Sequence, residues 1–155
     1  MASSRFSVAV HTLALLARYD GGKPLKSEAV ACLVKTNAVV IRRLLSDLAG
    51  AGLVVSQAGA AGGTRLAKKP EEIFLNDVYK AVEDGQVFAL HRQKPDDRCE
   101  IGRSIQIVLT EIQNKLDTAI EESLGRISIA KVVEMIETEN AECRVKRVGD
   151  EHSEF

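Results

Sequence analysis

The sequence predicts a mainly α-helical chain with one small β-hairpin, followed by a long amphipathic helix. Two observations carry this expectation. Residues 27–70 contain two short helical patterns separated by a turn, and then two strand-like segments around a glycine-rich loop. Residues 101–124 carry apolar residues at helical spacing over about six turns. These patterns indicate a winged helix-turn-helix domain joined to a long dimerisation helix.

The composition is that of an ordinary globular protein. The chain has 155 residues, of which 45% are hydrophobic and 28% are charged, enough for one domain and an oligomerisation arm. It has no run of about 18 apolar residues and no signal-peptide pattern, so we expect a cytoplasmic protein with no membrane partner. Its cysteines, Cys32, Cys99 and Cys143, are too widely spaced for a disulfide framework, which fits a reducing compartment.

The first fifty residues predict three helices. Residues 5–19 are apolar nearly all round and predict a buried first helix. Ser27 is expected to cap a short second helix, and Thr36 or Asn37 is expected to cap a third. The tight turn between the second and third helices makes this pair a candidate helix-turn-helix.

The third helix presents two opposite faces. Its apolar residues follow the i, i+3, i+4, i+7 spacing of a buried stripe and are Ile41, Leu44, Leu45 and Leu48. The outward positions are small, hydrogen-bonding, β-branched or cationic, and are Thr36, Asn37, Val39, Val40, Arg42, Arg43 and Ser46. Such a face fits the major groove of double-stranded DNA, where arginine bonds guanine edges and valine contacts thymine methyl groups. We therefore expect this helix to read DNA sequence.

The hairpin that follows is the predicted wing. Residues 53–56 and 64–67 read as its strands, and the loop between them has almost no side chains. A loop so bare is able to lie against a phosphate backbone or enter a minor groove. The wing residues expected to contact DNA are Gly59, Gly62, Gly63, Arg65 and Lys68. The alternative interpretation is a helical hairpin followed by an ordinary flexible turn.

Charge is distributed unevenly along the chain. Residues 1–69 contain 10 Lys and Arg against 3 Asp and Glu, whereas residues 70–155 contain 11 against 19, and the net charge is −1. A basic first half beside an acidic second half is typical of a DNA-reading module on a separate scaffold. Charge blocks of this size also arise in proteins that bind nothing anionic, but here the basic residues gather in the helix-turn-helix and the wing.

The predicted layout has four parts. A further helix over residues 76–84 completes a DNA-binding domain of residues 1–84, and the polar residues 85–100 form a linker loop. Residues 101–140 hold the long helix and a short C-terminal helix, and the polar tail at 141–155 is expected to be disordered.

The long helix carries one apolar stripe on residues Ile101, Ile105, Val108, Leu109, Ile112, Leu116 and Ile120. So long a stripe after a polar linker has too little domain left to cover it. Burial against a second copy predicts a two-fold homodimer. In the alternative the stripe packs within its own chain, with residues 127–136 folding back as a short helix.

These segments together resemble the Rrf-two family of winged-helix transcription regulators. The resemblance covers about residues 3–123 and rests on VVIRRLL at 39–45, AGLV at 51–54, the GxxGG wing at 59–63 and P-x-E-I at 70–73. It implies a homodimer with a long crossing helix that binds a partly palindromic operator. One departure is Ala58, where the family usually has arginine before the first wing glycine. Either Arg65 or Lys68 takes over the minor-groove contact of that arginine, or the wing contributes less specificity in this chain.

A second departure concerns cofactors. Members of this family with an iron–sulfur cluster carry three closely spaced cysteines between the wing and the long helix, and this chain has only Cys99 there. One thiolate does not hold a cluster that needs about four protein ligands. We therefore expect no cofactor and no metal, as in the branch of the family without a cluster, with a cysteine or a small-molecule pocket as the sensor.

Cys99 is the candidate redox sensor. It lies in the polar linker beside Arg98, with Arg92 and Arg103 nearby in sequence, and cationic neighbours lower a thiol pKa. In the alternative, Cys99 is an inert remnant and a small molecule sets DNA affinity.

Enzyme motifs such as GxxxxGK[ST], G-x-S-x-G and HExxH do not occur. The predicted function is DNA-binding transcription regulation, most simply repression, and the alternative is a protein–protein docking module.

Overall fold

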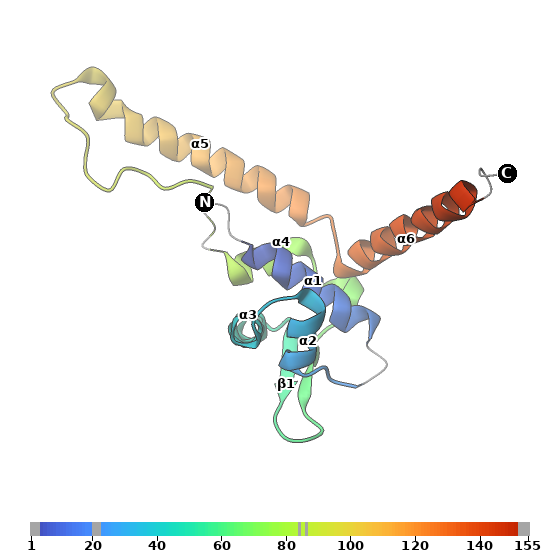
Figure 1. Cartoon of the computed structure of the whole chain (residues 1–155). Coiled ribbons are helices and arrows are strands. Elements are labelled where there is room, and N and C mark those ends of the chain that lie inside the picture. Colours follow the sequence, from blue (N-terminus) through green and yellow to red (C-terminus); the bar gives the residue numbers. More distant parts are fainter. Residues whose placement is uncertain (1–3, 20–22, 84, 86, 152–155) are drawn as a thin grey trace.

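The structure, a computed structural model, describes residues 4–19, 23–83, 85 and 87–151, with side chains as far as residue 142 (Figure 1). Its elements in chain order are α1 (Arg5–Arg18), α2 (Ser27–Val34), α3 (Ala38–Gly50), β1 (Val54–Gln57), β2 (Gly63–Leu66), the 3₁₀ turn η1 (Pro70–Glu72), α4 (Leu75–Val82), α5 (Glu100–Leu124) and α6 (Ile129–Glu151). The predicted fold class is confirmed, because the described residues are mostly helical around one antiparallel hairpin.

The core lies where α1, α2, α3, α4 and the hairpin meet. Leu13, Ile41, Leu48, Leu53 and Val78 are at most 1% exposed. Each large apolar side chain buried in this way stabilises the domain by about 1.5–3 kcal/mol. The stripe predicted on the third helix is confirmed, because all four of its apolar residues are buried. This fixes which face of α3 points outward.

The hairpin starts one residue later than expected. Leu53 is buried, and its N–H bonds to the carbonyl of Leu48 at the end of α3, so the β ladder begins at Val54. Gly52, with φ of +72°, makes the left-handed turn between helix and strand, a conformation that glycine adopts without strain. Strand β2 is also held near its loop end by Leu25, which exchanges two backbone hydrogen bonds with Thr64 at 2.8 and 2.9 Å.

The second helix differs from the prediction at its start. Lys26, not Ser27, occupies the capping position, and Ser27 is the first helical residue. The Ser27 hydroxyl instead donates to a carboxylate oxygen of Glu28 at 3.2 Å. Leu33 is 50% exposed, because only one turn of this short helix faces the core.

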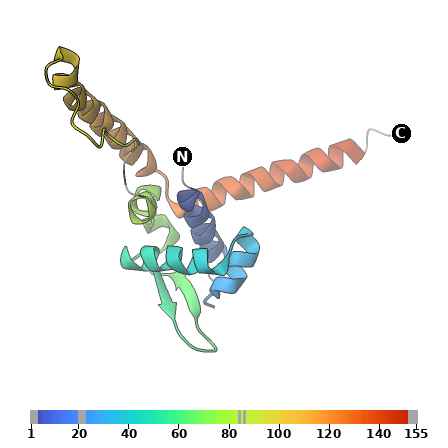
Figure 2. The ribbon, with the colours of Figure 1, turned by 60° about the vertical axis from the view of Figure 1, so that its left-hand side comes forward.

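Two long helices leave the domain in diverging directions (Figures 1 and 2). Backbone bonds from Leu75 N–H to the Ile127 carbonyl (2.9 Å) and from Ile129 N–H to the Ile73 carbonyl (2.8 Å) fasten the turn between them. Helix α6 packs on α1, and Arg18 forms an ion pair with Glu137. Helix α5 is tied to α4 by Lys80 and Glu121 at 3.0 Å. Both helices project from the side opposite to the hairpin.

Helix α6 is longer than the predicted short C-terminal helix. It continues past residue 140 to Glu151, through a stretch rich in Glu, Lys and Arg, which are good helix formers. Residues 152–155 of the expected disordered tail lie outside the described residues, as does residue 84, the predicted end of the first domain. None of the helices over the described residues is long and apolar enough to cross a membrane.

Candidate nucleic-acid interface

Helix α3 is positioned by its cap and by the turn before it. Asn37 is the N-cap, and its side-chain oxygen accepts a hydrogen bond from the Val39 N–H at 2.7 Å. Lys35 lies in the left-handed region with φ of 57°, and it is the one non-glycine residue with positive φ in the described part of the chain. This turn aims α3 across α2, as in a helix-turn-helix.

The outward face of α3 is open in the single chain. The side chains at residues Asn37, Val39, Val40, Arg42, Arg43 and Ser46 are exposed, and Thr36 is half-buried. Val39 and Val40 are 48% and 46% exposed although they are apolar. Exposed valines between arginines form a surface that is able to meet thymine methyl groups and guanine edges together.

A groove of about 560 Å³ runs between α3, the start of α2 and the hairpin. We call it the α3–hairpin groove, and its lining includes Glu28, Arg42, Ser46, Gln57, Gly62, Gly63 and Thr64. The structure thus brings Arg42 and Ser46 together with the wing glycines. A separate hollow of about 350 Å³ between α1 and α3 is lined by Thr36, Val40 and Arg43, with Ser4, Arg5, Val8 and Leu44.

The wing glycines allow close backbone packing and also leave the surface of the loop without side chains. A Cβ on Gly62 would lie 2.1 Å from the Gln57 carbonyl oxygen, and one on Gly63 would lie 2.8 Å from the backbone of Leu25. Gly63 also has φ of +153°, and Gly59 has φ of +105° with open space around it. Gly62 and Gly63 are therefore required for close backbone packing, which sequence analysis did not anticipate.

The basic wing residues lie apart from the groove. Arg65 pairs with Val55 in the strand register, on the opposite face of the hairpin from Ser56 and Thr64, whose hydroxyls are 2.8 Å apart. Arg65 and Lys68 are both exposed, and neither lines the α3–hairpin groove or the hollow beside α1. The sequence places these residues beside the loop, but it does not show to which face of the hairpin Arg65 belongs.

The arginines of α3 differ in their surroundings. Arg42 donates to Glu28 of α2 at 2.5 Å, and this bond is the main reason why the pKa of Glu28 lies below its ordinary value of 4.5. Arg43 forms no ion pair among the described residues. Asp47, the acidic residue on the outward face of α3, is paired with Arg5.

The groove also contains residues that the sequence pattern does not identify, namely Glu28 and the hairpin residues Ser56, Gln57 and Thr64, beside the predicted Gly59, Gly62 and Gly63. In the sequence, Glu28 is only an acidic residue in the first turn of a helix, where a negative charge is favourable. Its partner Arg42 is 14 positions away and is brought to it by the turn at Lys35. Periodicity identifies the outward face of one helix, but it does not show which side chain of a neighbouring helix faces it.

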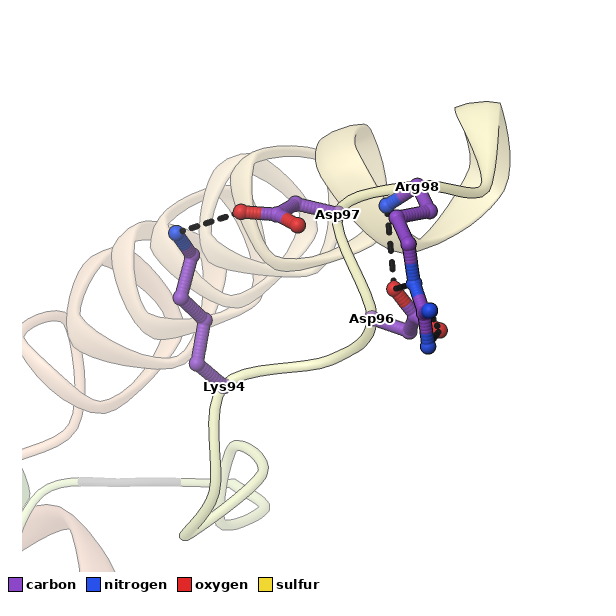
Figure 3. Close-up of polar contacts among 4 residues, drawn as sticks. All are labelled: Lys94, Asp96, Asp97 and Arg98. Carbon is purple, nitrogen blue, oxygen red and sulfur yellow. Dashed lines mark hydrogen bonds and ion pairs between the residues drawn. The ribbon is translucent and has the colours of Figure 1, made fainter.

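Cys99 is the N-cap of α5 and is exposed. The backbone amides of Gly102 and then Ile101, at the positive end of that helix, lower the pKa of its thiol from the ordinary value of 9.0. The sequence led us to expect that cationic neighbours lower the pKa of this thiol, and that expectation is wrong. The Arg98 guanidinium bonds the Asp96 carboxylate at 2.9 and 3.1 Å and lowers the pKa of that acid (Figure 3). Lys94 is likewise paired with Asp97 at 3.2 Å.

The predicted stripe on α5 is divided between two faces. Ile105, Leu109 and Ile120 are half-buried against the chain's own linker and α4, on the side where Gln113 Nε2 donates to the Phe88 carbonyl at 3.0 Å. The neighbouring face remains exposed and consists of Ile101 (72%), Val108 (47%), Ile112 (43%) and Leu116 (40%). We call these four residues the open stripe. Helix α6 diverges from α5 and does not fold back over it (Figure 2).

Comparison with known proteins assigns the chain to a family. A family model described as "Rrf2: Iron-dependent Transcriptional regulator" matches residues 2–135. The chain is 37% identical over 134 residues to the "Putative HTH-type transcriptional regulator YwnA" of Bacillus subtilis (strain 168), covering 86% of this chain and 97% of that protein.

Solved structures agree in fold. One titled "Crystal structure of a putative DNA binding protein" is 34% identical, with a TM-score of 0.67 over 83% of this chain and 98% of that chain. The structure of CymR (YrzC), the global cysteine regulator of B. subtilis, is 22% identical, with a TM-score of 0.64 over 87% and 97% of the two chains. At that identity the likeness to CymR shows the fold alone.

The iron named in the family description does not fit the donors among the described residues. No three His, Cys, Asp or Glu side chains converge on a metal-binding arrangement within the described residues. Cys99 and Cys32 are both single exposed thiols on different elements, and an iron–sulfur cluster needs about four protein ligands. With its hairpin, its helix-turn-helix and a family match over residues 2–135, the chain belongs to the Rrf2 (Rrf-two) family of winged-helix transcriptional regulators.

Proposed function

We propose that this protein is a sequence-specific repressor that binds a partly palindromic DNA operator as a homodimer. The observation that carries the proposal is the outward face of α3, with exposed valines and an arginine, Arg43, that has no ion-pair partner among the described residues. On the same helix, Arg42 and Ser46 line the α3–hairpin groove, whose opposite wall includes Gly59, Gly62 and Gly63 of the hairpin.

In this proposal α3 enters the major groove of DNA. Val39, Val40, Arg42 and Arg43 meet base edges, and the amino end of the helix at Thr36 and Asn37 faces a phosphate. The bare tip of the hairpin allows the backbone at Gly59 to approach the neighbouring phosphates or the minor groove. Bound to an operator that overlaps a promoter, such a domain represses by excluding polymerase.

Dimerisation is proposed from the open stripe of α5. Four large apolar residues in line on an exposed helix face favour burial against the same face of a second copy. A two-fold dimer presents two α3 helices and therefore recognises two half-sites related by symmetry. Helix α5 projects from the side of the domain opposite to the hairpin (Figure 1), so pairing through this helix would leave both proposed DNA-binding faces free.

The first prediction tests DNA binding itself. The protein should enrich one partly palindromic sequence from a pool of randomised duplexes. Its affinity for that duplex should fall steeply with salt, by about 10³–10⁵ between 50 and 200 mM if the dimer neutralises about 6–10 phosphates. Fluorescence anisotropy across a salt series measures this slope. Failure to enrich any sequence, or binding that is indifferent to salt, would contradict the proposed function and favour a docking module.

We also propose control by an oxidant or a small ligand, with Cys99 as the candidate sensor. Cys99 is the N-cap of the helix that carries the open stripe. A change at its sulfur would therefore alter the proposed dimer interface and, through it, the spacing of the two DNA-binding domains. The thiolate sulfur attacks one oxygen of hydrogen peroxide, the O–O bond breaks and hydroxide leaves, to be protonated by water; the sulfur becomes a sulfenic acid and the peroxide is the oxidant. A lowered pKa increases the thiolate fraction available for this reaction.

The second prediction concerns the reactivity of Cys99. In a variant that keeps Cys99 but carries Cys32→Ser and Cys143→Ser, the rate of alkylation by iodoacetamide should rise with pH at a lower midpoint when the protein is folded than in urea. The sign follows from the lowered pKa, since the folded thiol loses its proton at lower pH.

Peroxide should weaken operator binding by this same variant and leave Cys99→Ser unaffected. A loss of binding that persists in Cys99→Ser would remove Cys99 from the mechanism. No loss in either protein would leave a small ligand as the signal.

A further inference from the structure

Glu28 stands out as an acidic side chain on the surface proposed to meet DNA. Between residues 27 and 69 the sequence has two acidic residues, Glu28 and Asp47, against six basic ones. Asp47 is paired with Arg5 of α1. Glu28 instead lines the α3–hairpin groove, in the first turn of α2, where a phosphate-binding surface would ordinarily exclude a carboxylate.

The carboxylate of Glu28 is held in place from two sides. Its Oε1 accepts a hydrogen bond from Arg42 Nη2 at 2.5 Å, and its Oε2 accepts one from the Ser27 hydroxyl at 3.2 Å. The pKa of Glu28 lies below its ordinary value, with Arg42 as the largest cause, so the group is ionised throughout the physiological pH range. The side chains of Arg42 and Glu28 are 55% and 62% exposed, so the pair is open to competition by an incoming ligand.

Arginine has more donors than this pair uses. The guanidinium carries five N–H groups, and one hydrogen bond links it to Glu28. Arg42 is therefore able to keep its hydrogen bond to Glu28 and still present its remaining N–H groups to a base edge in the major groove of DNA. To reach a phosphate outside the groove it must leave Glu28, and the carboxylate then faces the DNA without its partner.

We propose that Glu28 sets the DNA selectivity of the protein by competing with the phosphate backbone for Arg42. This inference rests on the proposed DNA binding. On the operator, Glu28 holds Arg42 toward a base. On other sequences, Glu28 denies Arg42 to the phosphates. An exposed ion pair of this kind is worth up to about fivefold in an equilibrium constant, so the effect is a modest bias against wrong sequences.

The experiment compares two duplexes on the same protein samples. One is the sequence that the wild type selects from a randomised pool, and the other is a random sequence of the same length. Glu28→Gln keeps the shape and one acceptor oxygen but removes the charge. Glu71→Gln is the matched control, because it removes one charge from an exposed residue of η1 outside the groove.

Glu28→Gln should bind the random duplex about two- to fivefold more tightly and change little on the selected duplex, so the ratio of the two affinities falls. Glu71→Gln should leave that ratio unchanged. In a background of Arg42→Gln, Glu28→Gln should no longer lower the ratio. Because both duplexes are measured on one sample, any loss of folded protein cancels in the ratio.

The outcomes separate the two levels of the proposal. A wild type that shows neither sequence preference nor salt dependence would overturn the DNA-binding function and this inference with it. A wild type that binds selectively, with Glu28→Gln behaving like Glu71→Gln, would overturn the inference alone. A fall in the ratio that persists without Arg42 would also overturn it, because Glu28 would then act on DNA directly.

Discussion

Replacing Ile112 by glutamate is expected to dissociate the proposed homodimer at micromolar concentration. Ile112 lies in the middle of the open stripe, and a carboxylate buried there against a second copy has no partner. The penalty for burying an unpaired charge is several kcal/mol. Sedimentation velocity should show a monomer, and affinity for a palindromic operator should fall because the two heads are no longer linked.

The structure allows dissociation to be distinguished from unfolding. Ile112 is 43% exposed in the single chain, so glutamate at this position is solvated in the monomer and should leave the circular dichroism spectrum unchanged. Asn114→Glu is the matched control, because this exposed residue lies about 200° around the same helix. It should remain dimeric. A folded, intact dimer of Ile112→Glu would mean that the open stripe is not the interface.

The features that the sequence predicts well are those written in local periodicity. The buried stripe of α3 and the length of α5 follow from apolar spacing, and Asn37 follows from the residue types that cap helices. The same spacing does not show that the apolar stripe of α5 is divided into a half-buried face and an exposed face. Whether Leu109 or Val108 faces its own chain depends on where the linker runs, and Gln113 reveals that path only through its bond to Phe88.

The features that were missed depend on tertiary contacts or on backbone geometry. The pairing of Arg42 with Glu28 requires the crossing of α2 and α3, which no pattern within one helix encodes. The environment of Cys99 was attributed to arginines adjacent in sequence, but Arg98 turns to Asp96 and the helix amides act on the thiol instead. Neighbours in sequence are not necessarily neighbours in space, and this matters most in a polar linker.

Arg43→Ala is expected to weaken operator binding by about 1–3 kcal/mol and to relax specificity at one base position, because it removes a bidentate contact to a guanine. Unlike Arg42, Arg43 has no ion pair among the described residues. In the protein without DNA, therefore, no such ion pair has to break before Arg43 binds a base. It lines the same hollow as Thr36 and Val40 and lies near the middle of α3. Affinities for all four bases at each operator position would locate the contact.

Lys68→Ala provides the contrast, because an exposed lysine beside the hairpin is expected to contact phosphate only. It should weaken the operator and a random duplex by the same factor. It should also reduce the slope of log affinity against log salt by about 0.9 for each phosphate that the dimer no longer neutralises. Arg43→Ala should instead act mainly on the operator. Equal weakening on both duplexes for Arg43→Ala would show that this arginine holds the backbone, and base reading would then fall to Arg42 and the two exposed valines of α3.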